Sequence, residues 1–272
     1  MVVDKNSDVI NFNNPETLSM DKMEKLFVPD EMIFLRNCIV NVNGRDYVYK
    51  LSDEESLLNE LIGCYLAKLL GIDSVDYQIG VYDDTVYVLS EVLFKEGFNY
   101  FYPKTYFGKL AGQDAYSDDD FDLKKVFVKD KILKGIKDKK LLNDVLKLIA
   151  IDFKMNQLDR NQTNLIIKED IEGHSSLAPL YDFEFSYQES LLYPDDYYYD
   201  NPLIILKKNW LSLEAFFLRY PNVYRYLRKI KDISVLDILE IISKEKGLII
   251  SDEIYEHYKT AEKTANKALK LI

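Results

Sequence analysis

The chain has 272 residues, of which 47% are hydrophobic, so it is long enough to bury one large core or two modest ones. Its formal net charge of −11 disfavours direct binding to nucleic acid, which requires a concentrated basic face that releases counterions. Cys38 and Cys64 are too few for a disulfide framework or a four-ligand zinc site, and His174 and His257 add no metal-ligand spacing.

The N-terminal residues and the hydropathy pattern indicate where the protein resides. The segment MVVDKNSDVINFNN has neither a charged region followed by an apolar core nor a small-residue cleavage site. No later apolar run approaches the roughly 20 residues that a membrane-spanning helix needs. We therefore expect a soluble, cytoplasmic protein with no membrane partner.

The first predicted element is a β-hairpin over residues 32–51. Two apolar runs, MIFLRNCIVNV and RDYVYKL, are separated by Asn43-Gly44, a dipeptide that readily adopts the positive φ angles of a tight turn. This pairing places Lys50 at the end of the second strand.

The segment SDEESLLNELIGCYLAKLLGI predicts a helix. Ser52 is its expected N-cap, acidic residues occupy the first turn, and Gly71 ends it. Glu60 and three small residues share one stripe at i, i+3, i+4 and i+7 spacing, where small side chains permit close packing: Glu60, Gly63, Cys64 and Ala67. We expect Glu60 to face packed neighbours rather than bulk water.

Two further β-rich runs, YQIGVYDD and TVYVLSEVLF, flank an acidic turn at Asp83-Asp84 and complete a small antiparallel sheet with one helix. Residues 95–120 mix aromatic, glycine and acidic residues without a period, which is typical of a connection between lobes or a loop over a cleft. We therefore predict an N-lobe over residues 1–94 and a mainly helical C-lobe over residues 95–272.

The C-lobe begins with two helical stretches from Asp122 onward, and KKLLNDVLKLIAIDFKMNQL is expected to be a core helix. Two short strands follow in LDRNQTNLIIKED and GHSSLAPLYDFEFSY, joined by a turn at Glu172-Gly173, with polar residues crowded at their ends. Residues 203–272 show helical periodicity. The predicted fold class is α+β, with two lobes.

Five residues occur in the order found in protein kinases. Lys50 ends a hairpin, Glu60 lies on the next helix, Asp159 and Asn164 share a helix-to-strand loop, and Asp182 follows the later hairpin. Phosphoryl transfer needs a cation on the phosphates, a carboxylate that orients the attacking hydroxyl, and oxygen ligands for magnesium. Each requirement has a candidate in this set.

The expected roles follow from residue chemistry. Lys50 would contact the phosphates of ATP while pairing with Glu60, and Asp159 would orient the acceptor hydroxyl and accept its proton. Asn164 and Asp182 would supply oxygen ligands to Mg²⁺. Each residue also has a simpler interpretation: a surface lysine, a solvated glutamate, or an Asp or Asn in an ordinary turn.

Two neighbouring segments complete the predicted site. The backbone from Glu91 to Leu93 lies where an inter-lobe hinge would meet adenine, and Val88, Leu89 and Leu93 line either its apolar slot or the core of the sheet. The segment after Asp182 carries hydroxyls that are candidates for phosphorylation or for simple packing. These are Ser186, Tyr193 and the run Tyr197, Tyr198 and Tyr199.

Short blocks of the chain resemble the HipA-like kinases. NQLDRNQTNLIIK followed by SLAPLYDFE resembles their D-x4-N loop and the strand end that follows it, and NELIGCYLAKLLGI resembles their N-lobe helix. The resemblance extends over roughly residues 32–270 in element order. It implies a bacterial Ser/Thr kinase with a two-lobed fold that uses ATP and magnesium, often with autophosphorylation. It also implies an unidentified protein substrate and an antitoxin-like partner.

The chain departs from the kinase pattern at several positions. Before Lys50 it carries only Gly44, where kinases have a glycine-rich loop over the phosphates. Asn161 stands where a Lys or His is usual, and whether Arg160 compensates depends on its direction. Glu184 replaces the glycine of the Asp-Phe-Gly tripeptide, which adds a carboxylate near the predicted metal.

These departures leave two alternatives open. A pseudokinase would use the folded cleft to bind a nucleotide or a partner without catalysis. A kinase of a small molecule or a lipid would use the same set of Asp, Asn and Asp residues. An acidic chain without a basic amphipathic face, however, argues against binding to a lipid surface.

Overall fold

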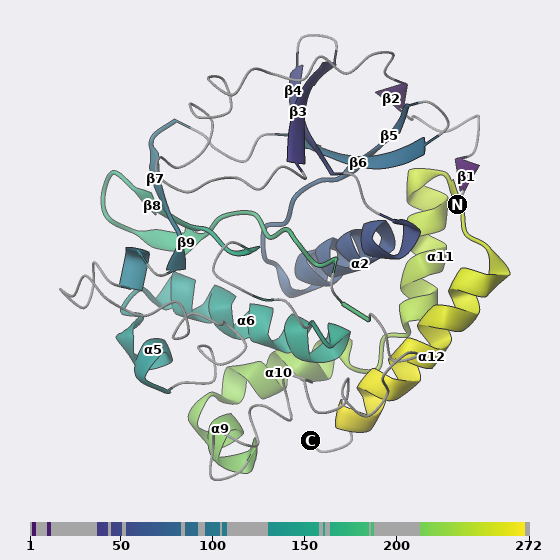
Figure 1. The fold of residues 1–272 in the computed structure, drawn as a ribbon. Coiled ribbons are helices and arrows are strands. Elements are labelled where there is room, and N and C mark those ends of the chain that lie inside the picture. The colour runs from purple at the N-terminus through teal and green to yellow at the C-terminus, as the bar shows by residue number, and fades with distance from the viewer. Residues whose placement is uncertain are drawn as a thin grey trace.

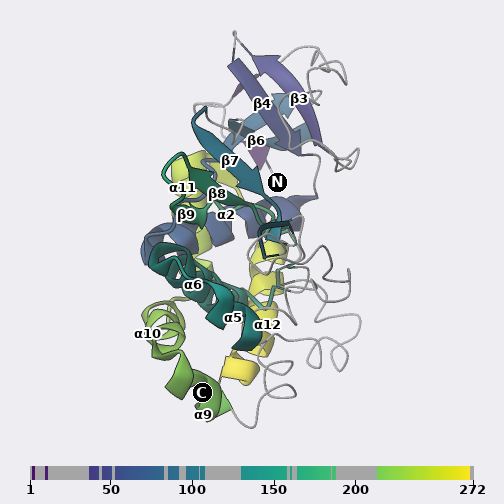
Figure 2. The same ribbon diagram turned by 90° about the vertical axis from the view of Figure 1, so that its left-hand side faces the viewer.

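A computed structural model describes the chain at residues 2–3, 10–11, 37–42, 45–50, 53–82, 85–91, 96–103, 105–107, 130–157, 160, 164–184, 186–187 and 213–269. A five-stranded sheet lies at one end and most of the helices lie at the other, with helix α2 and a three-stranded sheet between them (Figures 1 and 2). Within the described residues, no helix is both long and apolar enough to cross a bilayer.

The five-stranded sheet has the order β2-β5-β6-β4-β3. The predicted hairpins are confirmed as two antiparallel pairs, although their turn residues at 43–44 and 83–84 lie outside the described residues. The sheet is not wholly antiparallel, because β2 pairs in parallel with β5 at one edge. Its strands are β2 (Ile10–Asn11), β3 (Asn37–Val42), β4 (Arg45–Lys50), β5 (Gln78–Tyr82) and β6 (Thr85–Glu91).

Helix α2 (Glu54–Leu70) has the expected start and stop signals, with one correction. Its N-cap is Asp53 instead of Ser52, because the Asp53 carboxylate accepts a hydrogen bond from the Ser56 amide at 2.7 Å. At its end Gly71 has a φ of +66°, a left-handed angle that favours glycine. Most of the helix is buried, because helices α6, α10 and α11 contact it and the five-stranded sheet lies above it in Figure 1.

The second sheet has the order β7-β8-β9 and is antiparallel. Strand β7 (Phe98–Phe101) lies inside the segment that we expected to be irregular. Its four residues are too short to show a period, and it becomes a strand by pairing with β8 (Ile167–Asp170), far along the chain. Strand β9 (Ser175–Leu177) confirms the hairpin predicted around Glu172-Gly173.

The remaining elements confirm the predicted helical region. They are α5 (Asp130–Gly135), α6 (Lys139–Met155), α9 (Leu213–Arg219), α10 (Pro221–Ile230), α11 (Val235–Lys246) and α12 (Asp252–Leu269). One exception is β10 (Leu248–Ile249), which pairs with β1 (Val2–Val3). A single apolar core runs from α2 through α6 to α12.

Helix α12 is fastened to the rest of this region by a charged group. Lys154 on α6 donates a hydrogen bond to the Glu262 carboxylate at 2.9 Å. The same carboxylate accepts the amide of Val235 at 3.0 Å, at the N-terminus of α11. One side chain of α12 therefore joins three helices.

Asp138 provides a test of how α6 is attached to β9. Its carboxylate accepts the amides of Lys140 and Leu141 at the start of α6 and, through the other oxygen, the amide of Ser175. We predict that Asp138→Ala lowers the free energy of unfolding by about 1–2 kcal/mol, measured by urea unfolding at neutral pH. Asp232→Ala, at an exposed position, is the control and should change little.

The effect of Asp138 should depend on pH. Burial acts to raise the pKa of Asp138, but the three amide hydrogen bonds outweigh it and leave the pKa below its ordinary value. The stabilisation is therefore present at neutral pH and is lost as the pH falls through the lowered pKa. The stability difference between the parent and Asp138→Ala should shrink below about pH 4; a difference that grows there would contradict the assignment.

Candidate functional site

Glu60 lies in the middle of α2 with none of its surface exposed, as its stripe of small neighbours predicts. One carboxylate oxygen accepts hydrogen bonds from the Tyr77 hydroxyl at 3.2 Å and from the Phe183 amide at 3.0 Å. Burial and the charge of Glu60 raise the pKa of Tyr77, so its hydroxyl remains a donor. Glu60 thus connects α2 directly to the segment that carries Asp182.

Asp182 follows β9 in a left-handed conformation, with a φ of +62° that short polar residues tolerate better than branched ones. Its carbonyl accepts a hydrogen bond from the Gln157 side chain at 3.0 Å. The carboxylates of Glu60, Asp182 and Glu184 each offer an oxygen within 4.8 Å of the others. Three carboxylates this close repel one another.

Phe183 fixes the distance between α2 and the Asp182 segment. A Cβ atom at Gly63 would lie 2.2 Å from the Cγ of Phe183, so the ring rests directly on the helix backbone. The stripe of small residues therefore permits close packing, as predicted. This contact brings the backbone of Phe183 within reach of Glu60, one turn earlier on the same helix.

Arg160 is a buried cation with several hydrogen-bond partners in the described part of the site. Its guanidinium pairs with the Asp152 carboxylate at 3.0 Å, and its side chain is only 2% exposed. The sequence left the direction of Arg160 open, and in the structure the side chain points inward. One nitrogen lies 3.1 Å from the carbonyl oxygen of Asn164, 3.3 Å from that of Tyr181 and 3.4 Å from that of Asp182. Arg160 therefore ties together the two backbone segments that carry the predicted magnesium ligands.

The charge state of this pair follows from its surroundings. Burial acts to lower the pKa of Arg160, but the adjacent Asp152 raises it above its ordinary value, so the guanidinium stays charged. Burial raises the pKa of Asp152, and the ion pair with Arg160 opposes that rise. The Arg160 guanidinium also lies 4.8 Å from the centre of the Phe183 ring, where a cation is favourable.

The segment after Asp182 is held by residues that were not among the site residues predicted from the sequence. The Asn59 amide donates to the carbonyl of Glu184 at 2.9 Å and to that of Ser186. The Asn59 oxygen accepts the hydroxyl of Tyr258, on α12, at 2.9 Å. We call Asn59 and Tyr258 the clamp. A polar Asn next to Glu60, in the mostly apolar middle of the helix, was the available signal.

The backbone of Tyr187 extends this attachment to α6. Its amide donates to the Met155 carbonyl at 3.1 Å, and its hydroxyl lies 3.3 Å from the Lys154 carbonyl. Ser186, one of the hydroxyls considered for phosphorylation, is fully buried, and its Oγ has no hydrogen-bond partner among the residues that the structure describes. In this conformation Ser186 is therefore inaccessible to a modifying enzyme. The tyrosines at 193 and 197–199 lie outside the described residues.

The other predicted site residues are placed as follows. Lys50 ends β4 with its backbone paired to Asn37 and Val88, but its side chain lies outside the described atoms, so its pairing with Glu60 remains a prediction. Glu91 ends β6 opposite Tyr47. Asn164 is 4% exposed and precedes β8. Val88 and Leu89 are fully buried, whereas Asp159, Asn161 and Leu93 lie outside the described residues.

Comparison with known proteins identifies the fold. The Helicobacter pylori proinflammatory kinase CtkA has a TM-score of 0.60 and 12% identity, over 97% of this chain and 95% of CtkA. HipA from a Shewanella oneidensis complex with HipB and operator DNA has a TM-score of 0.48 and 9% identity, over 97% of this chain and 73% of HipA. The choline kinase LicA from Streptococcus pneumoniae has a TM-score of 0.27 and 13% identity, over 91% of this chain and 97% of LicA.

The likeness to CtkA confirms that the chain has the two-lobed, protein-kinase-like fold that its resemblance to HipA-like kinases implies. At 12% identity the likeness to CtkA establishes only the fold. The TM-scores of HipA and LicA, 0.48 and 0.27, are too low for these structures to support any further conclusion. No protein-family model and no curated protein sequence matches the chain.

Gly63 provides a test of the packing between α2 and Phe183. We predict that Gly63→Ala destabilises the protein by about 1–3 kcal/mol, because its methyl group would overlap the buried ring. Gly135→Ala is the matched control, since a Cβ there meets no atom of the described residues within 4 Å. Urea unfolding of both variants is the measurement, and equal stability of the two would contradict the packing.

The clamp provides a second test. Tyr258→Phe removes one hydroxyl and leaves the Asn59 oxygen buried without that partner, so we expect a loss of about 1–3 kcal/mol. Hydrogen exchange should also become faster at the Ser186 and Tyr187 amides. Tyr255→Phe, a half-buried position on the same helix, is the control. Unchanged exchange in Tyr258→Phe would show that the clamp does not hold this segment.

Proposed function

We propose that the protein is an ATP- and Mg²⁺-dependent phosphotransferase whose acceptor is a Ser or Thr hydroxyl of a protein, the chain's own hydroxyls included. The observation that carries the proposal is the convergence of Glu60, Asp182 and the Asn164 backbone around Arg160. These residues come from three separate segments, and they meet in a protein-kinase-like fold. CtkA, which shares the fold, is described as a kinase.

The residues present fit a magnesium ion. Asp182 and Glu184 are half-buried carboxylates within 4.8 Å of a fully buried Glu60, and such a concentration of negative charge is favourable next to a divalent cation. The Asn164 and Asp182 side chains would hold Mg²⁺ through oxygen atoms. When bound, the ion neutralises charge on the phosphates and orients them.

The chain's own residues perform the remaining steps in this proposal. Lys50 contacts the phosphates of ATP, and the backbone from Glu91 to Leu93 receives the adenine. Asp159 orients the acceptor hydroxyl and takes its proton as the hydroxyl oxygen bonds to the γ-phosphorus. The bond between that phosphorus and the bridging oxygen breaks, and ADP leaves. Arg160 holds the backbone of both metal-binding segments throughout.

The experiment is phosphate transfer from radiolabelled ATP with Mg²⁺, to the protein itself and to a generic protein acceptor. We predict that Asp159→Asn and Asp182→Asn lower incorporation by about 10²- to 10⁴-fold, with thermal unfolding used to check that each variant is folded. Asp232→Asn is the control. Analysis of the labelled amino acid tests the Ser/Thr assignment.

The other outcomes separate the alternatives. Stabilisation by ATP and Mg²⁺ without any transfer would favour the pseudokinase. ADP formation only when a small alcohol, an amino sugar or a lipid is added would favour a kinase of that acceptor. Absence of both stabilisation and transfer would overturn the nucleotide site. An antitoxin-like partner stays a prediction.

A further inference from the structure

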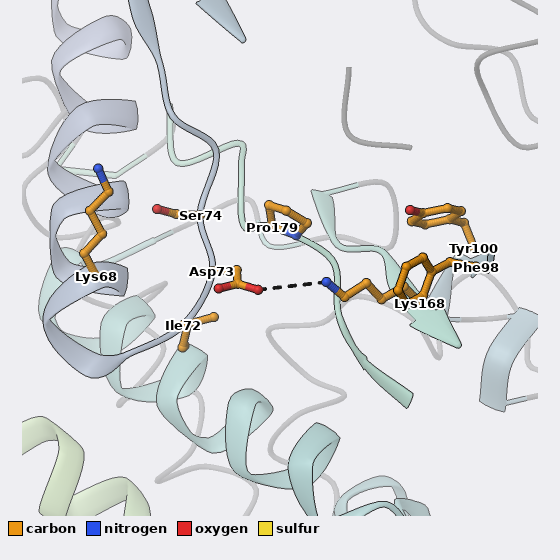
Figure 3. Close-up of a pocket in the computed structure, with 8 residues that line it drawn as sticks. All are labelled: Lys68, Ile72, Asp73, Ser74, Phe98, Tyr100, Lys168 and Pro179. Atoms are coloured by element: carbon orange, nitrogen blue, oxygen red, sulfur yellow. Dashed lines mark ion pairs between the residues drawn. The ribbon is translucent and has the colours of Figure 1, made fainter. Parts of the chain in front are cut away.

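A cavity of about 410 Å³ lies on the surface between the C-terminal end of α2 and the sheet of β7 and β8 (Figure 3). It includes none of the residues assigned to phosphate transfer. Side chains from α2 and the loop after it line one side, and side chains from β7 and β8 line the other. The lining residues are Lys68, Ile72, Asp73, Ser74, Phe98, Tyr100, Lys168 and Pro179.

Two lysines bring positive charge to the cavity. The Lys168 Nζ atom is 3.9 Å from the Asp73 carboxylate, and the Lys68 Nζ atom is 3.7 Å from Asp76. Both carboxylates are largely exposed, so these long ion pairs contribute little. An incoming anion can therefore replace the Asp73 carboxylate at Lys168 at small cost. In Figure 3 the Lys168 ammonium points toward the Asp73 carboxylate, whereas the Lys68 ammonium points away from it.

The opposite wall is aromatic. Phe98 and Tyr100 are two residues apart on β7, so both side chains lie on one face of the strand, and their ring centres are 6.4 Å apart. Phe98 is 40% exposed, so part of its ring is accessible to a ligand. The Lys168 Nζ atom lies 5.6 Å from the centre of the Phe98 ring, so the positive charge and the aromatic face are adjacent.

We propose that this cavity is a second binding site, for a small molecule in which a flat ring carries a phosphate or a carboxylate. The cavity volume is in the range of small-molecule sites. The ring would cover the exposed face of Phe98 beside Tyr100, and the anion would bind Lys168. This site goes beyond the proposed phosphate transfer and does not depend on it.

The cavity is joined to the Asp182 segment through the backbone. The Val75 amide donates to the Leu180 carbonyl at 3.0 Å, and the Leu180 amide donates to the Asp73 carbonyl at 2.9 Å. Leu180 lies between Pro179, in the cavity wall, and the Tyr181-Asp182 pair. A ligand that orders Asp73 and Pro179 therefore also orders the backbone leading into Asp182.

The test uses phenyl phosphate and benzoate as probes, titrated into the full chain and followed by calorimetry. Inorganic phosphate and phenol are the single-feature controls. We expect saturable binding of at least one probe at one site, tighter than either control, and weakened about tenfold or more by Lys168→Met and by Phe98→Ala. Lys263→Met and Leu218→Ala, both at exposed positions elsewhere, should bind normally.

The tighter probe identifies the anion as phosphate or carboxylate. Hydrogen exchange at the Val75 and Leu180 amides should slow when the probe is bound. Binding that is equal in the parent, Lys168→Met and Phe98→Ala would overturn the proposed location, and no saturable binding of either probe would overturn the site itself. Tyr100→Ala is the further variant if one of the first two does not fold. None of these measurements requires ATP or phosphate transfer.

Discussion

The geometry of the candidate site depends on one buried guanidinium. A charged group out of water is costly unless it is paired and its donors are satisfied. Arg160 meets this requirement with the Asp152 carboxylate on one side and the carbonyls of Asn164, Tyr181 and Asp182 on the other. Because these partners come from α6 and from two later segments, satisfying the charge also determines where those segments lie.

The left-handed backbone at Asp182 is sustained by the same arrangement. Such a conformation persists only where its surroundings hold it, and here the carbonyl of Asp182 is bound by Gln157 while the next amide is bound by Glu60. Gly63 allows the Phe183 ring to approach α2 closely enough for that second bond. The result is a cluster in which Glu60, Asp182 and Glu184 each offer a carboxylate oxygen within 4.8 Å of the others.

Local signals in the sequence predicted helices and strands. Features that depend on contacts between distant segments could not be predicted from these signals. The Gly71 stop signal and the spacing around Glu60 correctly predicted helix α2 and its buried face. Strand β7 was missed because a four-residue strand acquires its structure from a partner some 70 positions away. The inward direction of Arg160 and the contact between Asn59 and Tyr258 were also beyond local patterns, since both depend on how distant segments pack.

The clamp between Asn59 and Tyr258 has a consequence for the order in which the protein matures. The two residues are 199 positions apart, and the ribosome releases Tyr258 long after Asn59 and the Asp182 segment. Until α12 emerges, the Asn59 side chain that binds the carbonyls of Glu184 and Ser186 lacks its hydrogen bond from the Tyr258 hydroxyl. The candidate site therefore reaches its final form only after α12 has been synthesised.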